Sequence, residues 1–227
     1  MTTTPWDAIA LSLQVATACT LLGAPPAVAL GWWLARREHP AKALVTALVF
    51  APMVLPPVVT GLLLLALLGK HGPLGAVLDR LGLAVAFTPA APVLAALVVG
   101  LPLFVMSARA AFAAVDPAYD ELSASLGDRP RRTWWRVSLP LALPGLAGGA
   151  VLMFARSLGE FGATIVLAGN TDATRTIAIA IYALLDRPAS GPDVRVLAWS
   201  SVAISLFALA GYEWLARWQR RRLDLPR

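Results

Sequence analysis

Charged side chains are scarce in this sequence. They make up 14% of its 227 residues, whereas soluble domains carry roughly a quarter. Hydrophobic residues account for 58%, and the mean hydropathy is +0.70. The net charge of +6 does not indicate nucleic-acid binding, because the basic residues are spread over separate loops beside apolar runs. These values predict an integral membrane protein.

Residues that carry catalysis or bind metals are also few. The one cysteine, Cys19, lies inside an apolar run, so an internal disulfide is excluded. His39 and His71 fall in loops expected on opposite sides of the membrane, which argues against a shared metal. No Gly-x4-Gly-Lys-Ser/Thr phosphate loop is present. We therefore expect no catalytic residue, no metal site and no cofactor bound by this chain, and ATP hydrolysis is not expected of it.

Apolar runs long enough to cross a bilayer recur along the chain, since a crossing takes roughly 20 residues of helix. They predict one all-α domain over residues 1–227 with five membrane spans, at about 8–35, 43–69, 84–108, 139–167 and 196–215. Pro56 and Pro57 lie near the middle of the second span, where a neighbouring helix or a lined cavity must satisfy the freed carbonyls. No Lys or Arg precedes Arg36, so we expect no cleaved signal peptide.

The fourth apolar stretch, from Pro140 to Gly169, is longer than one upright crossing needs, at roughly 45 Å as a helix. We expect this span to be tilted or kinked. Ile177–Leu185 is apolar but too short to cross. It is expected to be a helix that lies at the membrane surface or dips back into the protein.

The distribution of Lys and Arg predicts the orientation of the chain. Thirteen of these residues fall in segments 36–42, 109–136 and 217–227, whereas five fall in the intervening loops. Basic residues concentrate on the cytoplasmic side of membrane proteins. We therefore expect a multi-pass membrane protein with the N-terminus outside and the C-terminus in the cytoplasm.

The longest polar interruption runs from Asp116 to Pro140 and contains the signals of a short helix at 117–127. Asp116 is a favourable N-cap, and Pro117 suits the first helical position. Gly127 supplies a left-handed stop. Tyr119, Leu122 and Leu126 are spaced three and four apart, so they share one apolar face. This pattern predicts an amphipathic cytoplasmic helix with a surface to dock against.

The same stretch resembles the EAA loop of ABC importer permeases. Glu121, Gly127 six residues later, and Val137-Ser138-Leu139-Pro140 after nine more match that family's spacing, although Leu122 and Ser123 replace its two alanines. In the family this helix docks into a cytoplasmic ATPase and transmits its motion. The resemblance therefore implies an ATPase-coupling set, namely Tyr119, Asp120, Glu121, Leu122, Ser123, Leu126, Gly127, Leu139 and Pro140.

Arg156 and Glu160 are the two charges inside the fourth apolar stretch. They lie four apart, so an intrahelical pair is possible, and charges at membrane depth usually face a protein interior or an aqueous path. One interpretation places them, with Pro56 and Pro57, at a gate or along the transport path. The other treats the pair as structural, at a contact between helices. An intramembrane enzyme that uses Glu160 as acid or base, or a membrane scaffold without a path, would be a different class of protein.

RSLGEFGAT at 156–164 resembles the permease branch for molybdate and related tetrahedral oxyanions. LPPVV with Gly61, TRTI at 174–177 and EWLAR at 213–217 extend the match in order along the chain. The resemblance implies a location in the bacterial inner membrane. It also implies a second copy of the chain, two cytoplasmic ABC ATPase subunits that bind ATP and Mg²⁺, and an extracytoplasmic oxyanion-binding protein. A sulfate, thiosulfate or tungstate permease is the alternative within the family.

Overall fold

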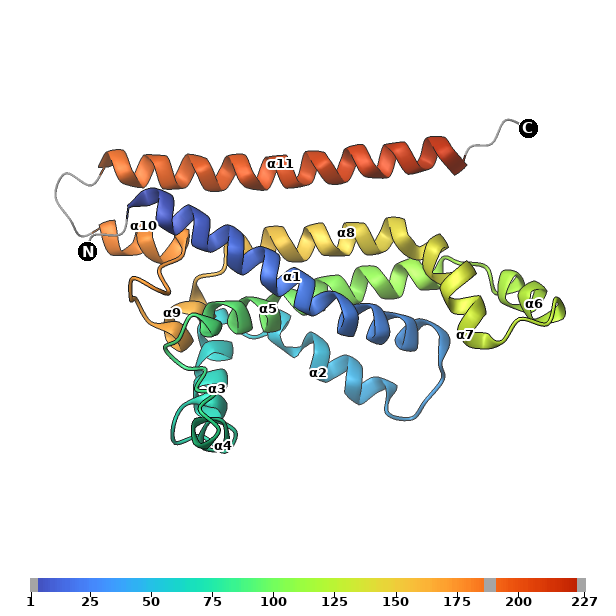
Figure 1. Cartoon of the computed structure of the whole chain (residues 1–227), viewed down its shortest axis with the longest axis horizontal. Helices are drawn as coiled ribbons and strands as arrows, with labels where there is room; N and C mark the ends of the chain where they lie inside the picture. Colours follow the sequence, from blue (N-terminus) through green and yellow to red (C-terminus); the bar gives the residue numbers. More distant parts are fainter. Residues whose placement is uncertain (1–3, 186–190, 224–227) are drawn as a thin grey trace.

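The computed structural model describes residues 4–185 and 191–223, and the regular structure of these residues is helical (Figure 1). In chain order the elements are α1 (Pro5–Arg36), α2 (Lys42–Val54), α3 (Pro57–Leu68), α4 (Gly75–Arg80), α5 (Ala90–Ala113), α6 (Pro117–Ser125), α7 (Pro130–Thr133), a π-helical turn (Trp134–Ser138), α8 (Leu139–Leu158), α9 (Gly162–Ala168), α10 (Ile177–Leu185) and α11 (Gly191–Leu223).

The centre of the molecule is formed by α1, α5 and α8, with α5 packed extensively against both of the others. Small residues let these helices approach closely. A Cβ atom on Gly31 of α1 would lie 2.5 Å from the Ala108 Cβ of α5. On Gly145 of α8, a Cβ atom would lie 2.5 Å from the Ala111 Cβ. The long helices are therefore closely packed through small side chains.

The second predicted span is broken at its two prolines. Residues 43–69 form two helices, α2 and α3, whose axes differ by 118° across Leu55 and Pro56. Pro57 begins α3 at its first position, where a missing N–H is tolerated. Pro56 restricts the preceding residue to extended backbone, and Leu55 has φ −70° and ψ 143°. Two adjacent prolines thus turn the chain sharply.

The fourth predicted span, expected over 139–167 and tilted or kinked, is interrupted near its end. α8 ends at Leu158, and α9 begins at Gly162 after a three-residue break. At its other end, α8 continues from α7 through the π-helical turn, in which the Leu139 N–H donates to the Trp134 carbonyl. The long helical segment is therefore Pro130–Leu158, which is shifted toward the polar loop.

The remaining boundaries shift less. The third span is α5, which starts at Ala90 instead of 84, because a non-helical segment with positive φ at Gly82 and Phe87 precedes it. α10 matches the predicted short helix, and the Ile177 N–H donates to Ser12 Oγ of α1 over 2.8 Å. α11 is longer than its predicted span and lies along α8 and α10 with most of its surface exposed.

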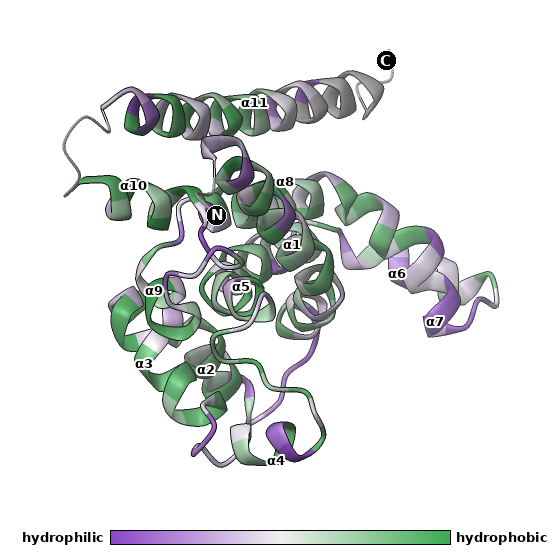
Figure 2. Ribbon diagram, turned by 60° about the vertical axis from the view of Figure 1, so that its left-hand side comes forward, coloured by the Kyte–Doolittle hydropathy of each residue, from purple (hydrophilic) through white to green (hydrophobic). Residues whose placement is uncertain are grey.

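Four helices of the described residues are long and apolar enough to cross a membrane, and the bent α2–α3 pair raises the number to five. α1 begins at one end of the molecule, whereas α6 and α7 lie at the other end, where α1 and α5 finish and α11 ends (Figure 1). Hydrophobic residues dominate the long helices, and hydrophilic ones gather on α6 and α7 (Figure 2). The predicted all-helical, polytopic architecture is confirmed.

Candidate functional site

The helix predicted at 117–127 is α6, and both of its ends follow the sequence signals. The Asp116 carboxylate accepts the Ala118 N–H at 2.9 Å, and Pro117 occupies the first turn. Gly127 has φ +84°, with nothing within 4 Å of the position of a Cβ atom. Its role is therefore conformational: it lets the chain reverse after α6.

One face of α6 is fixed to the body of the protein through polar contacts. Asp120 accepts a hydrogen bond from Ser138 Oγ at 2.9 Å. The buried hydroxyls of Ser123 and Thr133 lie 2.9 Å apart, and Ser123 Oγ donates to Asp128 at 3.2 Å. Asp120 and Ser123 thus tie α6 to α7 and the π-helical turn, and this face is not free to contact another protein.

Arg36, at the end of α1, links this helix to the N-terminal part of α6 and to the chain just before it. Its Nη2 donates to the Val115 carbonyl at 2.7 Å, just before α6, and lies 3.7 Å from the Asp120 carboxylate. The Arg36 side chain is 16% exposed and that of Asp120 37%. A displacement of α6 would therefore act on α1 as well as on α5 and α8.

A second face of α6, beside the tethered one, is apolar and exposed. Tyr119 is 51% exposed, Leu122 61% and Leu126 79%, and Glu121 beside them is exposed as well. Three large apolar side chains on the most polar end of the molecule form an unusual surface for a short helix. The sequence-predicted coupling residues thus divide into an outward set and an inward set.

Leu139 and Pro140, the last two coupling candidates, do not lie on α6. They begin α8, where Leu139 is half-buried against the main apolar cluster and Pro140 is exposed. Pro140 falls in the first turn, which tolerates its missing N–H. These residues set the start of α8 and the position of the π-helical turn above α6.

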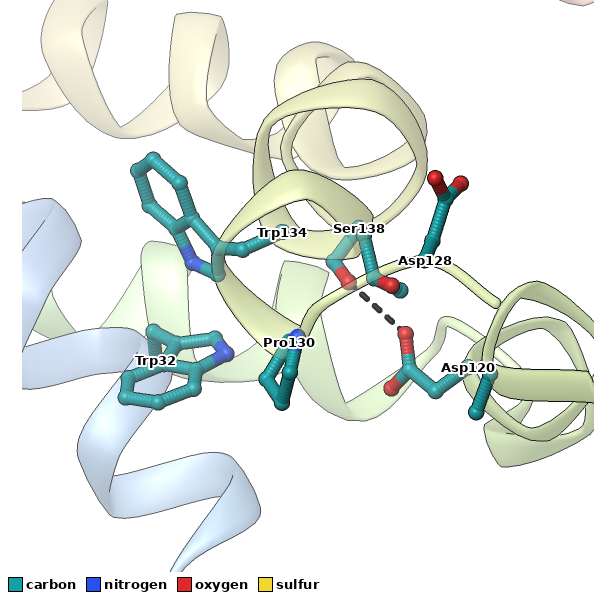
Figure 3. A pocket seen from close by; sticks show the side chains of 8 residues that line it. Trp32, Asp120, Asp128, Pro130, Trp134 and Ser138 are labelled. Atoms are coloured by element: carbon teal, nitrogen blue, oxygen red, sulfur yellow. Dashed lines mark hydrogen bonds between the residues drawn. The ribbon is translucent and has the colours of Figure 1, made fainter. Parts of the chain in front are cut away.

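A cavity of about 240 Å³ lies between α6, α7 and the end of α1. Figure 3 shows the hydrogen bond between Asp120 and Ser138 on one side of it and Trp32 and Trp134 on the other. The segment that carries α6 is therefore not solidly packed against the body. It is connected by directional polar contacts around an open space.

The second predicted pair, Arg156 and Glu160, does form. Arg156 Nη1 lies 2.8 Å from Glu160 Oε2, and the Glu160 side chain is 2% exposed. The other carboxylate oxygen accepts the Ala163 N–H at 2.8 Å, at the start of α9. Glu160 therefore links Arg156, near the end of α8, to the first turn of α9 and stabilises the break between the two helices.

Pro57 and the α8–α9 break meet at one place. A Cβ atom on Gly162 would lie 2.8 Å from the Pro57 Cβ, and one on Gly61 would lie 2.8 Å from the Ala163 Cα. The bend at Pro57 and the segment that Glu160 fixes are thus packed together by α3 and α9. Pro56, at the bend, is exposed.

Several of these contacts could not be predicted from the sequence. Arg36 is separated from Val115 by 79 positions, and its only sequence signal was its charge beside a span. Thr133 and Asp128 carry no signal of their own in the loop, and Ser138 was marked only as part of the Val137–Pro140 motif. Within the described ranges, no group of three or more His, Cys, Asp and Glu residues is placed to bind a metal ion.

The chain matches the family model described as binding-protein-dependent transport system inner membrane component over residues 27–225. It is 41% identical to the molybdenum transport system permease protein ModB of Escherichia coli K12 over 224 residues, which is 98% of each chain. It is 38% identical to the Haemophilus influenzae protein of the same name, with 96% of each chain covered. The Mycobacterium tuberculosis protein of that name is 45% identical over 79% of this chain and 69% of its own length.

Solved structures of similar fold are ABC importers. A bacterial transporter that imports alginate matches with a TM-score of 0.69 at 19% identity, covering 95% of this chain and 78% of that one. The MetNI methionine transporter in inward-facing conformations matches with a TM-score of 0.68 at 15% identity, covering 94% and 93%. These similarities concern the fold.

Proposed function

Because the chain belongs to the family of binding-protein-dependent transport system inner membrane components, we propose that it is the permease subunit of an ATP-driven molybdate importer. It is a multi-pass membrane protein and a transport subunit, not an enzyme. The proposed substrate rests on one observation: the chain is 41% identical to a molybdenum transport permease over 98% of both chains.

The proposed assembly contains a second copy of this chain, with the transport path on the two-fold axis between them. Two cytoplasmic ABC ATPase subunits bind ATP and Mg²⁺, and an extracytoplasmic binding protein delivers the oxyanion. The exposed apolar face of α6 supports the ATPase contact, because it lies at the polar end of the molecule and is left uncovered by the described residues of this chain.

Transport would proceed by alternating access. Closure of the ATPase dimer on ATP brings the two α6 helices together, and the contacts of Arg36 and Asp120 carry this displacement into α1 and the start of α8. The membrane helices then open outward to receive molybdate, and hydrolysis returns them to the inward-open state. In this mechanism Arg156 and Glu160 maintain the shape of the α8–α9 break beside α3.

Uptake of labelled molybdate by the reconstituted permease, ATPase and binding protein tests the proposal. We expect ATP-dependent uptake that excess unlabelled molybdate suppresses and sulfate or thiosulfate does not. Suppression by sulfate or thiosulfate at equal concentration would assign the chain to those oxyanions instead. Preferential suppression by tungstate would assign it to tungstate. Uptake without any ATPase would reject the coupling mechanism.

A charged residue introduced on the exposed apolar face of α6 should disrupt ATPase docking without disrupting the fold of the permease. Leu122→Asp is expected to abolish co-purification of the ATPase, because an unpaired carboxylate would be buried in the contact. Leu81→Asp is the matched control: Leu81 is 67% exposed against 61% for Leu122, and it lies beyond α4, away from α6. Equal retention of the ATPase by both variants would refute the docking role of this face.

A further inference from the structure

A groove of about 670 Å³ lies between the last turns of α1 and the segment formed by α7 and the π-helical turn. It borders the cavity beneath α6, since Trp32, Pro130 and Trp134 line both. Its floor is apolar and includes Ala29 and Leu30. Its remaining walls are dominated by four tryptophans and two arginines, namely Trp32, Trp33, Trp134, Trp135, Arg37 and Arg131.

The two arginines of this groove differ from their immediate neighbours. Arg36 lies near the Asp120 carboxylate, and Arg132 is paired with Asp128 at 3.0 Å. In contrast, Arg37 and Arg131 are exposed and have no carboxylate within ion-pair distance among the described residues. The Arg37 guanidinium lies 5.5 Å from the centre of the Trp32 ring. Two cations at the rim of one groove are thus left for an external anion.

The ligand that fits this combination has an anionic head and a long apolar tail. Tryptophan side chains favour the membrane–water boundary, where one part of the ring is apolar and the N–H is wet. Arginine binds phosphate through its planar fork of donors. A free inorganic anion would use the arginines alone and leave the apolar floor uncovered.

We propose that this groove is a binding site for one anionic phospholipid. Its phosphate lies between Arg37 and Arg131, and an acyl chain follows Leu30 and Trp33 of α1. The lipid therefore contacts α1 on one side and α7 with the π-helical turn on the other, next to the cavity beneath the coupling helix. It braces the segment that carries α6 against α1. This site depends neither on the identity of the transported ion nor on the ATPase.

Native mass spectrometry of the delipidated full-length chain, titrated with phosphatidylglycerol or phosphatidylcholine, tests the site. We expect one phosphatidylglycerol per chain to bind at least tenfold more tightly than phosphatidylcholine. The double variant Arg37→Gln/Arg131→Gln should lose that preference, with a fall in phosphatidylglycerol affinity of about tenfold or more, since each basic side chain contributes to attraction of anionic lipid. Excess inorganic phosphate should not displace the lipid.

Two further variants make the result specific. Arg80→Gln/Arg195→Gln removes the same charge from exposed positions at α4 and the start of α11, and it should bind phosphatidylglycerol like the parent protein. Ala29→Phe fills the groove but keeps both arginines, and it should weaken binding as the Arg37/Arg131 variant does. Ala29 is exposed, so this change leaves the helical core intact.

Three outcomes would overturn the proposal. Equal affinity for the two lipids would mean that the protein binds only the non-specific lipid that surrounds any membrane protein. Displacement by inorganic phosphate would indicate a free-anion site. If the Arg37/Arg131 variant kept the lipid but no longer co-purified with the ATPase, these arginines would belong to a protein contact.

Discussion

Gly127 illustrates how one residue sets the geometry of the proposed coupling segment, residues 116–140. Its φ of +84° is in the left-handed region, and no atom lies near the position of a Cβ. A side chain there is therefore opposed by backbone strain alone, at about 1–2 kcal/mol for an ordinary L-residue. The strain acts at the point where α6 ends and the chain turns toward α7.

Gly127→Val is expected to lower ATPase activity stimulated by the loaded binding protein several-fold while the permease still inserts and assembles. The chain offers a close control, because Gly82 has φ +71° with equally open surroundings and lies far from α6. Gly82→Val carries similar strain and should leave stimulated ATPase activity unchanged. Assay of both variants in proteoliposomes makes the comparison. A similar loss in the two would mean that the effect is one of general stability.

Glu160 shows a different residue-scale effect, since both of its carboxylate oxygens have partners. Glu160→Ala leaves Arg156 without its partner and the Ala163 N–H without its acceptor. Loss of one member of a buried pair costs roughly 3–5 kcal/mol, and we expect the low end because Arg156 is 33% exposed. Glu160→Gln keeps an acceptor for Ala163, so it should be destabilised less.

Thermal unfolding of the purified protein in detergent measures this order. Glu38→Ala is the control for loss of an exposed pair, because Glu38 is 92% exposed and lies 2.9 Å from Lys42. Such pairs contribute little, so its unfolding temperature should match that of the parent. Equal destabilisation by Glu160→Gln and Glu160→Ala would contradict the role of Glu160 at the start of α9.

At the scale of elements, the contact between α3 and α9 joins two interruptions of the membrane helices. Gly61 makes this contact possible, because a Cβ atom there would approach the Ala163 Cα to 2.8 Å and the Ala163 carbonyl oxygen to 2.9 Å. Backbone atoms cannot move aside as the end of a flexible side chain can. The two short helices must therefore separate if the residue is enlarged.

Gly61→Ala is expected to destabilise the protein by about 1–3 kcal/mol, the usual cost of overpacking, and to reduce molybdate uptake. Gly211→Ala in α11 adds the same methyl group where nothing lies within 4 Å, so it should be neutral or slightly stabilising. Unfolding temperatures and uptake of the two variants are the measurements. Normal stability of Gly61→Ala would show that α3 and α9 are not in close contact.

On the scale of the whole molecule, the coupling segment, the ends of α1 and α5 and the end of α11 lie together, away from the start of α1 (Figure 1). This arrangement agrees with the concentration of Lys and Arg in the segments at that end. We therefore propose that this end faces the cytoplasm and that the start of α1 lies outside.

Fusions that report on location test this orientation. Alkaline phosphatase inserted after His71, in the loop between α3 and α4, should be active because that loop is assigned to the outside. The same enzyme inserted after Asp128, between α6 and α7, should be inactive, whereas a fluorescent protein there should fold and fluoresce. The opposite pattern at both positions would reverse the topology.

The sequence alone determined those features that depend on nearby residues or on composition. Low charge and long apolar runs were sufficient for an all-helical membrane protein, because the bilayer requires internal satisfaction of backbone hydrogen bonds. Asp116 and Gly127 were sufficient to predict where α6 begins and ends, since capping residues act within one helical turn. The Arg156–Glu160 pair followed from helical spacing.

Tertiary structure decided what depends on contacts between distant segments. The adjacent prolines predicted an interruption, but the bend of 118° exists because α3 turns to pack on α9. The link from Arg36 to Val115 spans 79 positions, and no local pattern encodes it. The sequence also could not divide the predicted coupling residues into buried and exposed sets. The positions of α7 and the π-helical turn decide which face of α6 is held against the protein.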